Sequence, residues 1–148
     1  MRIAVDFDGT IVENKYPQIG EEKLFAIETL KELQKHGHQI ILWTYRHGKE
    51  LEEAIEFCRK KGLEFYAVNK NYPEEIYDEN IMSRKIYADI YIDDKNLLGF
   101  PGWIETWKIL NEKFNICFTN TQYPSTIFKK RKNILKRILL LFFKTKKP

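Results

Sequence analysis

The sequence predicts an α/β fold built on a central parallel sheet with helices on both faces. Short apolar runs of strand length alternate along the chain with longer segments whose apolar residues recur at helical spacing. Three of the apolar runs end abruptly in polar residues, which is typical of buried parallel strands that deliver side chains at their carboxyl ends. Together these observations predict a Rossmann-like three-layer sandwich.

The first half of the chain is expected to contain two strands and two helices. The apolar run Arg2–Val5 ends at Asp6 and predicts a buried strand. A helix is expected from about Glu21 to His36, because its apolar residues share one face and a glycine follows. The run Gln39–Trp43 predicts the second buried strand, and Gly48–Lys61 has the apolar spacing of an amphipathic helix.

The second half is expected to add two more sheet strands, a helix and a last short strand. The run Leu63–Val68 predicts the third strand, and the polar stretch Asn69–Ser83 lacks periodicity and is predicted to be a functional loop. A fourth strand is expected from Asp89 or Ile90 to Ile92. A helix around Trp103–Lys113 and a short strand near Ile116–Phe118 complete the unit.

Composition excludes several classes of protein. The 148 residues are 43% hydrophobic and 14% aromatic, which is enough for a packed core and excludes a disordered or fibrous chain. No apolar run approaches the ~18 residues that a membrane span needs. The 2 cysteines are too few for a disulfide framework or a metal cluster, so a cytoplasmic location is expected.

Charge divides the chain into two parts. All 21 acidic residues lie at or before Glu112, whereas nine of the 25 basic residues lie between Lys129 and Lys147. Residues 1–128 therefore carry 16 basic against 21 acidic residues, a net charge of −5, and the last twenty carry +9. The acidic body argues against nucleic acid as the main ligand.

We therefore divide the chain into a hydrolase-like domain over residues 1–122 and a basic amphipathic tail over residues 123–148. The tail combines an apolar helical stripe with basic clusters at both ends. Three interpretations remain open: peripheral docking on anionic lipid at the inner face of the membrane, an apolar anchor for a second subunit, and a solvated terminus.

Four carboxylates are expected at the carboxyl edge of the sheet. Asp6 and Asp8 follow the first strand, and Asp93 and Asp94 follow the fourth. Carboxylates gathered in this way would repel one another unless a cation lies among them. The expected cofactor is a hard divalent ion held by oxygen ligands, namely Mg²⁺.

The motifs along the chain resemble those of a known superfamily. The string DFDGTIV at Asp6–Val12, a strand ending in Thr44, the cation Lys85, and IDD at Ile92–Asp94 combine carboxylates, a hydroxyl and an ammonium, a set suited to phosphoryl transfer. In this order they resemble the four motifs of the haloacid dehalogenase superfamily, in its phosphatase branch. The resemblance covers roughly residues 1–118 and is to the small capless hydrolases, because the segments between the motifs leave no room for a cap domain.

The resemblance implies roles for the residues of the first two motifs. Asp6 would be the nucleophile that forms an aspartyl-phosphate, and Asp8 would be the general acid and then the general base. Gly9 would let the backbone approach the phosphate, and Thr10 would orient Asp8 or cap the following turn. The hydroxyl of Thr44 would hold a phosphoryl oxygen.

The resemblance also implies the metal ligands. Mg²⁺ would be held by the Asp6 carboxylate, the Asp8 backbone carbonyl and one of Asp93 and Asp94, of which Asp94 is favoured. Lys85 would neutralise the charge that develops on the phosphoryl group.

Two basic residues have alternative interpretations. Lys70 rivals Lys85 for the phosphate-neutralising role, and is otherwise a residue of the substrate loop or a solvated charge. Arg46, just past Thr44, is either a clamp for a second anionic group of the substrate or a surface residue at a helix start.

The sequence thus predicts a Mg²⁺-dependent phosphomonoester hydrolase whose substrate is a small phosphate ester, either a sugar phosphate or a nucleotide. The missing cap suggests a homo-oligomer, since the resemblance is to capless enzymes, some of which close the site with a neighbouring subunit. The alternative is a catalytically inactive member that binds a membrane or a partner subunit. The presence of both Asp6 and Asp8 argues against that alternative.

Overall fold

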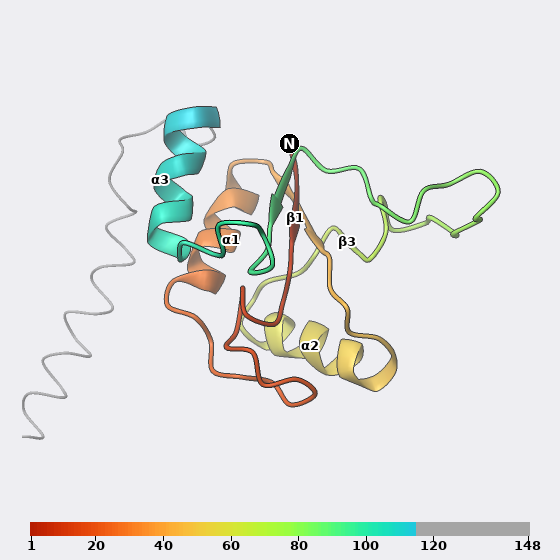
Figure 1. The fold of residues 1–148 in the computed structure, drawn as a ribbon, viewed down its shortest axis with the longest axis horizontal. Helices are drawn as coiled ribbons and strands as arrows, with labels where there is room; N and C mark the ends of the chain where they lie inside the picture. The colour runs from red at the N-terminus through yellow and green to blue at the C-terminus, as the bar shows by residue number, and fades with distance from the viewer. Residues whose placement is uncertain (115–148) are drawn as a thin grey trace, which may run out of the picture.

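The computed structural model describes residues 1–114, and within them the chain forms one parallel sheet with three helices (Figure 1). The sheet order is β3-β2-β1-β4, and every strand pairing is parallel. Its strands are β1 (Arg2–Val5), β2 (Gln39–Leu42), β3 (Ala67–Val68) and β4 (Ile90–Ile92). The predicted α/β class with a parallel sheet is confirmed.

The register of the sheet brings the ends of β1 and β4 to the same level. Val5, the last residue of β1, lies opposite Leu42 of β2 and Ile92 of β4. The backbone N–H of Asp6 continues this pairing by donating to the Ile92 carbonyl at 3.0 Å. The residues that follow these strands therefore emerge side by side at the carboxyl edge of the sheet.

The three helices are α1 (Ala26–Lys35), α2 (Gly48–Lys60) and α3 (Trp103–Phe114), and α1 packs against α3 (Figure 1). All three contribute buried side chains to one core cluster, together with the strand residues Ile3, Val5, Ile40 and Leu42. These strand residues share one face, because successive side chains of a strand alternate between faces. Right-handed crossovers that run from β1 to β2 to β3 place α1 and α2 on that same face.

The other face of the sheet contacts the last part of an irregular segment over residues 69–89. Ile86 of this segment is buried against Ala4, Ile41 and Ala67. The chain must return here from β3 across β2 and β1 to reach β4, so the connection crosses the face opposite α1 and α2. Within residues 1–114 the three helices thus share one core cluster on one face of the sheet, rather than lying on both faces as expected.

Two elements are shorter than predicted. Helix α1 begins at Ala26 instead of near Glu21, because the residues before it pair with the loop after β1. The backbone N–H of Glu13 donates to the Glu21 carbonyl at 2.8 Å, and the backbone N–H of Lys23 donates to the Ile11 carbonyl at 2.9 Å. Strand β3 covers only Ala67–Val68, the last part of the predicted run.

Other elements agree with the prediction to within one residue, including both ends of α2 and α3. The predicted strand at 116–118 and the tail at 123–148 lie outside the described residues. Within residues 1–114, no helix has both the length and the apolar character that a membrane crossing requires.

Candidate active site

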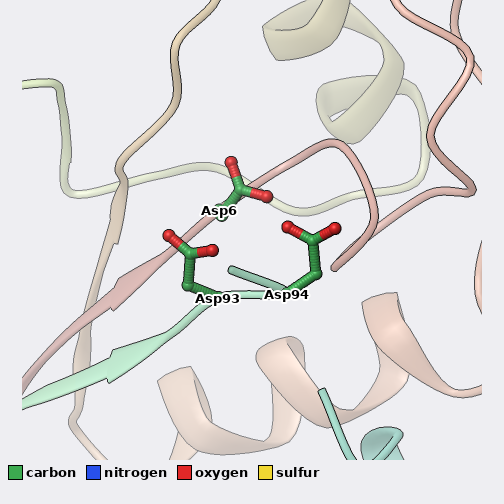
Figure 2. A group of neighbouring side chains, drawn as sticks. All are labelled: Asp6, Asp93 and Asp94. Atoms are coloured by element: carbon green, nitrogen blue, oxygen red, sulfur yellow. The ribbon is translucent and has the colours of Figure 1, made fainter. Parts of the chain in front are cut away.

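Of the four carboxylates expected together at the carboxyl edge of the sheet, three form one cluster, whereas the fourth, Asp8, is paired with Arg46. Asp6 follows β1, and Asp93 and Asp94 follow the neighbouring strand β4 (Figure 2). One oxygen of each side chain lies within 4.8 Å of the others. We call Asp6, Asp93 and Asp94 the acidic cluster.

The acidic cluster is electrostatically unfavourable without a cation. The pKa of Asp6 is raised to about 7, mainly by burial and also by the nearby charges of Asp93 and Asp94, while hydrogen bonds from the Phe7 backbone and Thr10 oppose the increase. The donor set consists of carboxylate oxygens, which suits a hard divalent ion such as Mg²⁺. The cluster therefore fits the expected metal.

Lys95 contacts the acidic cluster from the loop after β4. Its Nζ donates to Asp94 Oδ2 at 2.6 Å, and its backbone N–H donates to Asp93 Oδ1 at 2.7 Å. The hydrogen bond to Asp94 raises the pKa of Lys95. Sequence reasoning missed this residue, although its place directly after the IDD motif could have indicated it.

Thr10 links the two halves of the acidic cluster. Its hydroxyl donates to Asp6 Oδ2 at 3.2 Å and accepts the backbone N–H of Asp94 at 3.0 Å. The Trp103 indole N–H donates to the Thr10 carbonyl at 2.8 Å. Since Thr10 is fully buried, the expected contacts with Asp8 and with substrate are corrected: it orients Asp6 instead.

Gly9 allows the two strand ends to approach each other. Its φ of 91° lies in the left-handed region, and a Cβ built there would lie 2.1 Å from Asp94 Oδ2. A side chain at this position would displace a member of the acidic cluster. Gly9 is therefore required by its approach to Asp94, and the approach of its backbone to a phosphate stays a prediction.

Asp8 has surroundings quite different from those of Asp6. Arg46 donates to its two oxygens, from Nε to Oδ2 at 2.6 Å and from Nη2 to Oδ1 at 2.7 Å. This bidentate ion pair has a fully buried guanidinium on one side and a carboxylate with 14% of its side chain exposed on the other. Asp8 is therefore held in one orientation while part of it stays accessible.

The remaining donors of Arg46 are also occupied. Nη1 donates to the carbonyls of Pro17 at 2.9 Å and Glu50 at 3.5 Å, and Nη2 donates to the carbonyl of Gln18 at 2.8 Å. All five guanidinium N–H groups thus have acceptors. Both earlier interpretations of Arg46 are wrong: it is buried rather than at the surface, and it has no donor left to clamp a substrate.

Thr44 lies where the sequence places it, at the cavity beside the carboxylates. Its backbone N–H donates to Asn69 Oδ1 at 2.8 Å, and its hydroxyl oxygen accepts the backbone N–H of Arg46 at 3.3 Å. In these contacts the Thr44 hydroxyl acts only as an acceptor, so its O–H group can still donate a hydrogen bond.

The structure brings neither Lys85 nor its rival Lys70 to the lining of the cavity, which corrects the phosphate-neutralising role expected of one of them. The Lys85 ammonium lies over the Tyr91 ring, 5.4 Å from its centroid. Its neighbour Ile86 is buried on the second face of the sheet and holds the segment there. The Lys70 ammonium donates to the Pro73 carbonyl at 2.7 Å within its own loop.

A cavity of about 590 Å³ opens beside the acidic cluster. Four carboxylates line it, those of Asp6, Asp8, Asp93 and Asp94. The other polar side chains of the lining are Asn14, Thr44 and Lys95, and the aromatic ones are Tyr16, Trp43 and Tyr45. The volume lies within the range of small-molecule sites, roughly 300–1,000 Å³.

A conserved protein from Bacteroides thetaiotaomicron has a solved structure similar to this one. The two chains are 54% identical, with a TM-score of 0.72, and the match covers 81% of this chain and 98% of the other. The sequence matches no family model and no curated protein.

Proposed function

We propose that this chain, which belongs to the same family as the conserved Bacteroides thetaiotaomicron protein, hydrolyses phosphate monoesters with the aid of Mg²⁺. One observation carries the proposal: Asp6 belongs to a metal-suited acidic cluster, whereas Asp8, two residues away, is bound to Arg46. Two neighbouring carboxylates in such different surroundings suit two different roles.

The acidic cluster would hold the metal. Asp6 and Asp94, together with the backbone carbonyl of Asp8, are the ligands we assign, with Asp93 as the other candidate. Bound Mg²⁺ would supply neutralisation of the phosphate charge. This assignment agrees with the resemblance of the motifs to the haloacid dehalogenase superfamily.

Asp6 would act as the nucleophile. A carboxylate oxygen of Asp6 forms a bond to phosphorus while the bond between phosphorus and the leaving oxygen breaks, which gives an aspartyl-phosphate. The hydrogen bond from Thr10 to Asp6 Oδ2 orients the carboxylate for this attack. Asp8, which pairs with Arg46 as a carboxylate, would take the proton of the monoanionic phosphate ester and pass it to the leaving oxygen.

Asp8 would then reverse its role. It takes a proton from a water molecule, whose oxygen attacks phosphorus and releases inorganic phosphate and the free Asp6 carboxylate. Each oxygen of Asp8 accepts one hydrogen bond from Arg46, and a carboxylate oxygen has a second lone pair available for the proton. Arg46 thereby orients Asp8 without blocking proton transfer.

Thr44 and Lys95 would contact the phosphoryl group. The Thr44 hydroxyl has its proton available to donate to a phosphoryl oxygen. Lys95 lines the cavity and carries the positive charge that the sequence had assigned to Lys85. Its ammonium would move from Asp94 to the phosphoryl oxygens when a metal occupies the cluster.

The test is phosphate release from a panel of phosphate monoesters by the full-length protein. Activity should require Mg²⁺, disappear in EDTA and be lost in Asp6→Asn, which keeps the shape but is not a nucleophile. Asp78→Asn, at an exposed loop position, is the matched control and should retain activity. Full activity in Asp6→Asn or in EDTA would refute the mechanism, and no turnover of any ester would favour an inactive binding module.

A further inference from the structure

Three aromatic rings line the cavity, and the proposed chemistry uses none of them. Trp43 and Tyr45 flank Thr44, and Tyr16 belongs to the loop after β1. They thus come from two segments and meet beside the carboxylates. We call Tyr16, Trp43 and Tyr45 the aromatic wall.

Two of these rings are anchored and the third is exposed. Trp43 is half-buried and packs against the core cluster on the second face of the sheet. The Tyr16 ring lies against the Arg46 guanidinium, 5.4 Å from centroid to Cζ, and is 45% exposed. Tyr45 is 88% exposed although it lies within the site. A large aromatic surface presented beside a reaction centre is suited to binding a flat apolar group.

The positive charge available at the cavity limits how many phosphate groups the substrate can carry. Arg46 has used all its donors, so Lys95 is the cation in the cavity lining with donors to offer a phosphate. Residues 1–114 hold 16 basic and 21 acidic residues, a net charge of −5. These numbers suit one phosphate group and disfavour a di- or triphosphate or a polynucleotide, whose negative charges need many cations.

We propose that the substrate is a nucleoside monophosphate, with its base stacked on Tyr45 and enclosed by the rest of the aromatic wall. This proposal rests on the proposed function, whose phosphoryl site lies in the same cavity. Stacking of bases on aromatic side chains tolerates all bases, because every base has a π-face. The site would therefore discriminate strongly for the presence of a base and weakly among bases.

The test compares two substrates that differ only by the base: adenosine 5′-monophosphate and ribose 5-phosphate. The full-length enzyme with Mg²⁺ should have a higher kcat/KM for the nucleotide. Tyr45→Ala should lower that value roughly 5- to 150-fold, the range equivalent to one stacked base. The same variant should leave ribose 5-phosphate hydrolysis within about twofold, and Tyr45→Phe should restore nucleotide hydrolysis, because it keeps the ring.

Tyr87→Ala is the matched control, since Tyr87 is also exposed, at 70%, and does not line the cavity. Tyr87→Ala should leave kcat/KM unchanged for both substrates. Equal kcat/KM for both substrates in the wild type would overturn the proposal, as would an equal loss for both in Tyr45→Ala, which would place the ring against the pentose.

A binding measurement separates this proposal from the proposed function. Calorimetry on Asp6→Asn, which is not expected to turn over substrate, should show adenosine 5′-monophosphate binding at least about fivefold more tightly than ribose 5-phosphate. Adding Tyr45→Ala should abolish the difference. If the preference exists but the wild type hydrolyses no ester, the nucleotide site stands and the phosphatase proposal fails. If esters are hydrolysed without this preference, the phosphatase proposal stands and the nucleotide site fails.

Discussion

The Arg46 guanidinium donates to both carboxylate oxygens of Asp8, at 2.6 and 2.7 Å, and these two residues lie 38 positions apart in the sequence. The pair joins the loop after β1 to the segment after β2. The Arg46 guanidinium also lies over the Phe7 ring, 5.0 Å from its centroid. One buried side chain thus fixes the orientation of Asp8, the proposed acid and base.

Removing Arg46 should destabilise the fold. Arg46→Met leaves the mostly buried Asp8 carboxylate without its partner, so the free energy of unfolding should fall by about 3–5 kcal/mol. Chemical denaturation measures this. Arg59→Met, which removes an exposed ion pair with Glu56, is the control and should cost at most about 1 kcal/mol.

The double variant Arg46→Met with Asp8→Asn tests whether the effect comes from this pair. Its destabilisation should be clearly smaller than the sum of the two single changes, because the unpaired charge is then absent. Additive values would show that Arg46 acts through its other contacts.

Stability of the metal-free protein should depend on the protonation of Asp6. The pKa of Asp6 is about 7 in the folded protein, against an ordinary value of 3.8. Between about pH 4 and pH 7 the folded state therefore holds a proton on Asp6 that the unfolded state has lost. Stability therefore falls as pH rises from about 4 to 7, by roughly 2 to 4 kcal/mol in total. Denaturation in EDTA at several pH values measures this slope.

Asp6→Asn should flatten the slope and stabilise the metal-free protein above about pH 7, because no charge is then forced into the cluster. Mg²⁺ should stabilise the wild type more at about pH 8 than at about pH 5, since it competes with the proton. A wild-type slope that persists unchanged in Asp6→Asn would assign it to other groups.

Gly9→Ala should weaken metal binding. The added Cβ would lie 2.1 Å from Asp94 Oδ2, so the ligand must move, and Mg²⁺ affinity measured by calorimetry should fall at least about tenfold. Gly99→Ala shares the positive φ, at 70°, and has no atom within 4 Å of its Cβ. This control should keep Mg²⁺ affinity within about twofold. Equal losses in the two variants would point to backbone strain alone.

Lys95 and Lys85 can be separated by kinetics. Lys95→Met should lower kcat by roughly 10²-fold, the effect of losing one preorganised electrostatic donor. Lys85→Met should have little effect, because its ammonium lies over the Tyr91 ring. The opposite ranking would return the role to Lys85.

The basic tail gives a prediction from charge alone. Nine positive charges within the last twenty residues should attract anionic lipid by about 1 kcal/mol for each basic residue near the surface. Full-length protein should co-sediment with anionic vesicles at low salt and dissociate at high salt. Vesicles of neutral lipid are the control. Failure to bind anionic vesicles would exclude lipid docking and leave two interpretations of the tail, a subunit anchor and a solvated terminus.

The sequence predicted those parts of the site that depend on where strands end. Asp6 and Asp93 directly follow apolar runs, and parallel strands in register bring their ends together. The fold class followed for the same reason. The start of α1 was not predicted, because residues 21–23 pair with residues 11–13 of the loop after β1, and helical periodicity gives no information about such a pairing.

Partners distant in the sequence were also beyond prediction. Nothing in the spacing shows that Arg46 binds Asp8, 38 positions away, or that the Thr10 hydroxyl accepts the backbone N–H of Asp94, 84 positions away. The position of Lys85 depends on the path of residues 69–89 across the sheet, and that path is set by the burial of Ile86. Such contacts are tertiary, so periodicity and spacing carry little information about them.

The most direct test of the proposed mechanism is acid quenching of the enzyme during turnover, followed by mass spectrometry of its peptides. With Mg²⁺ and a hydrolysable phosphate ester, one phosphoryl group should be found on the peptide that contains Asp6. It should be absent in EDTA and in Asp6→Asn. Phosphate release without any adduct on that peptide, or an adduct that persists in Asp6→Asn, would contradict the role of Asp6 as nucleophile.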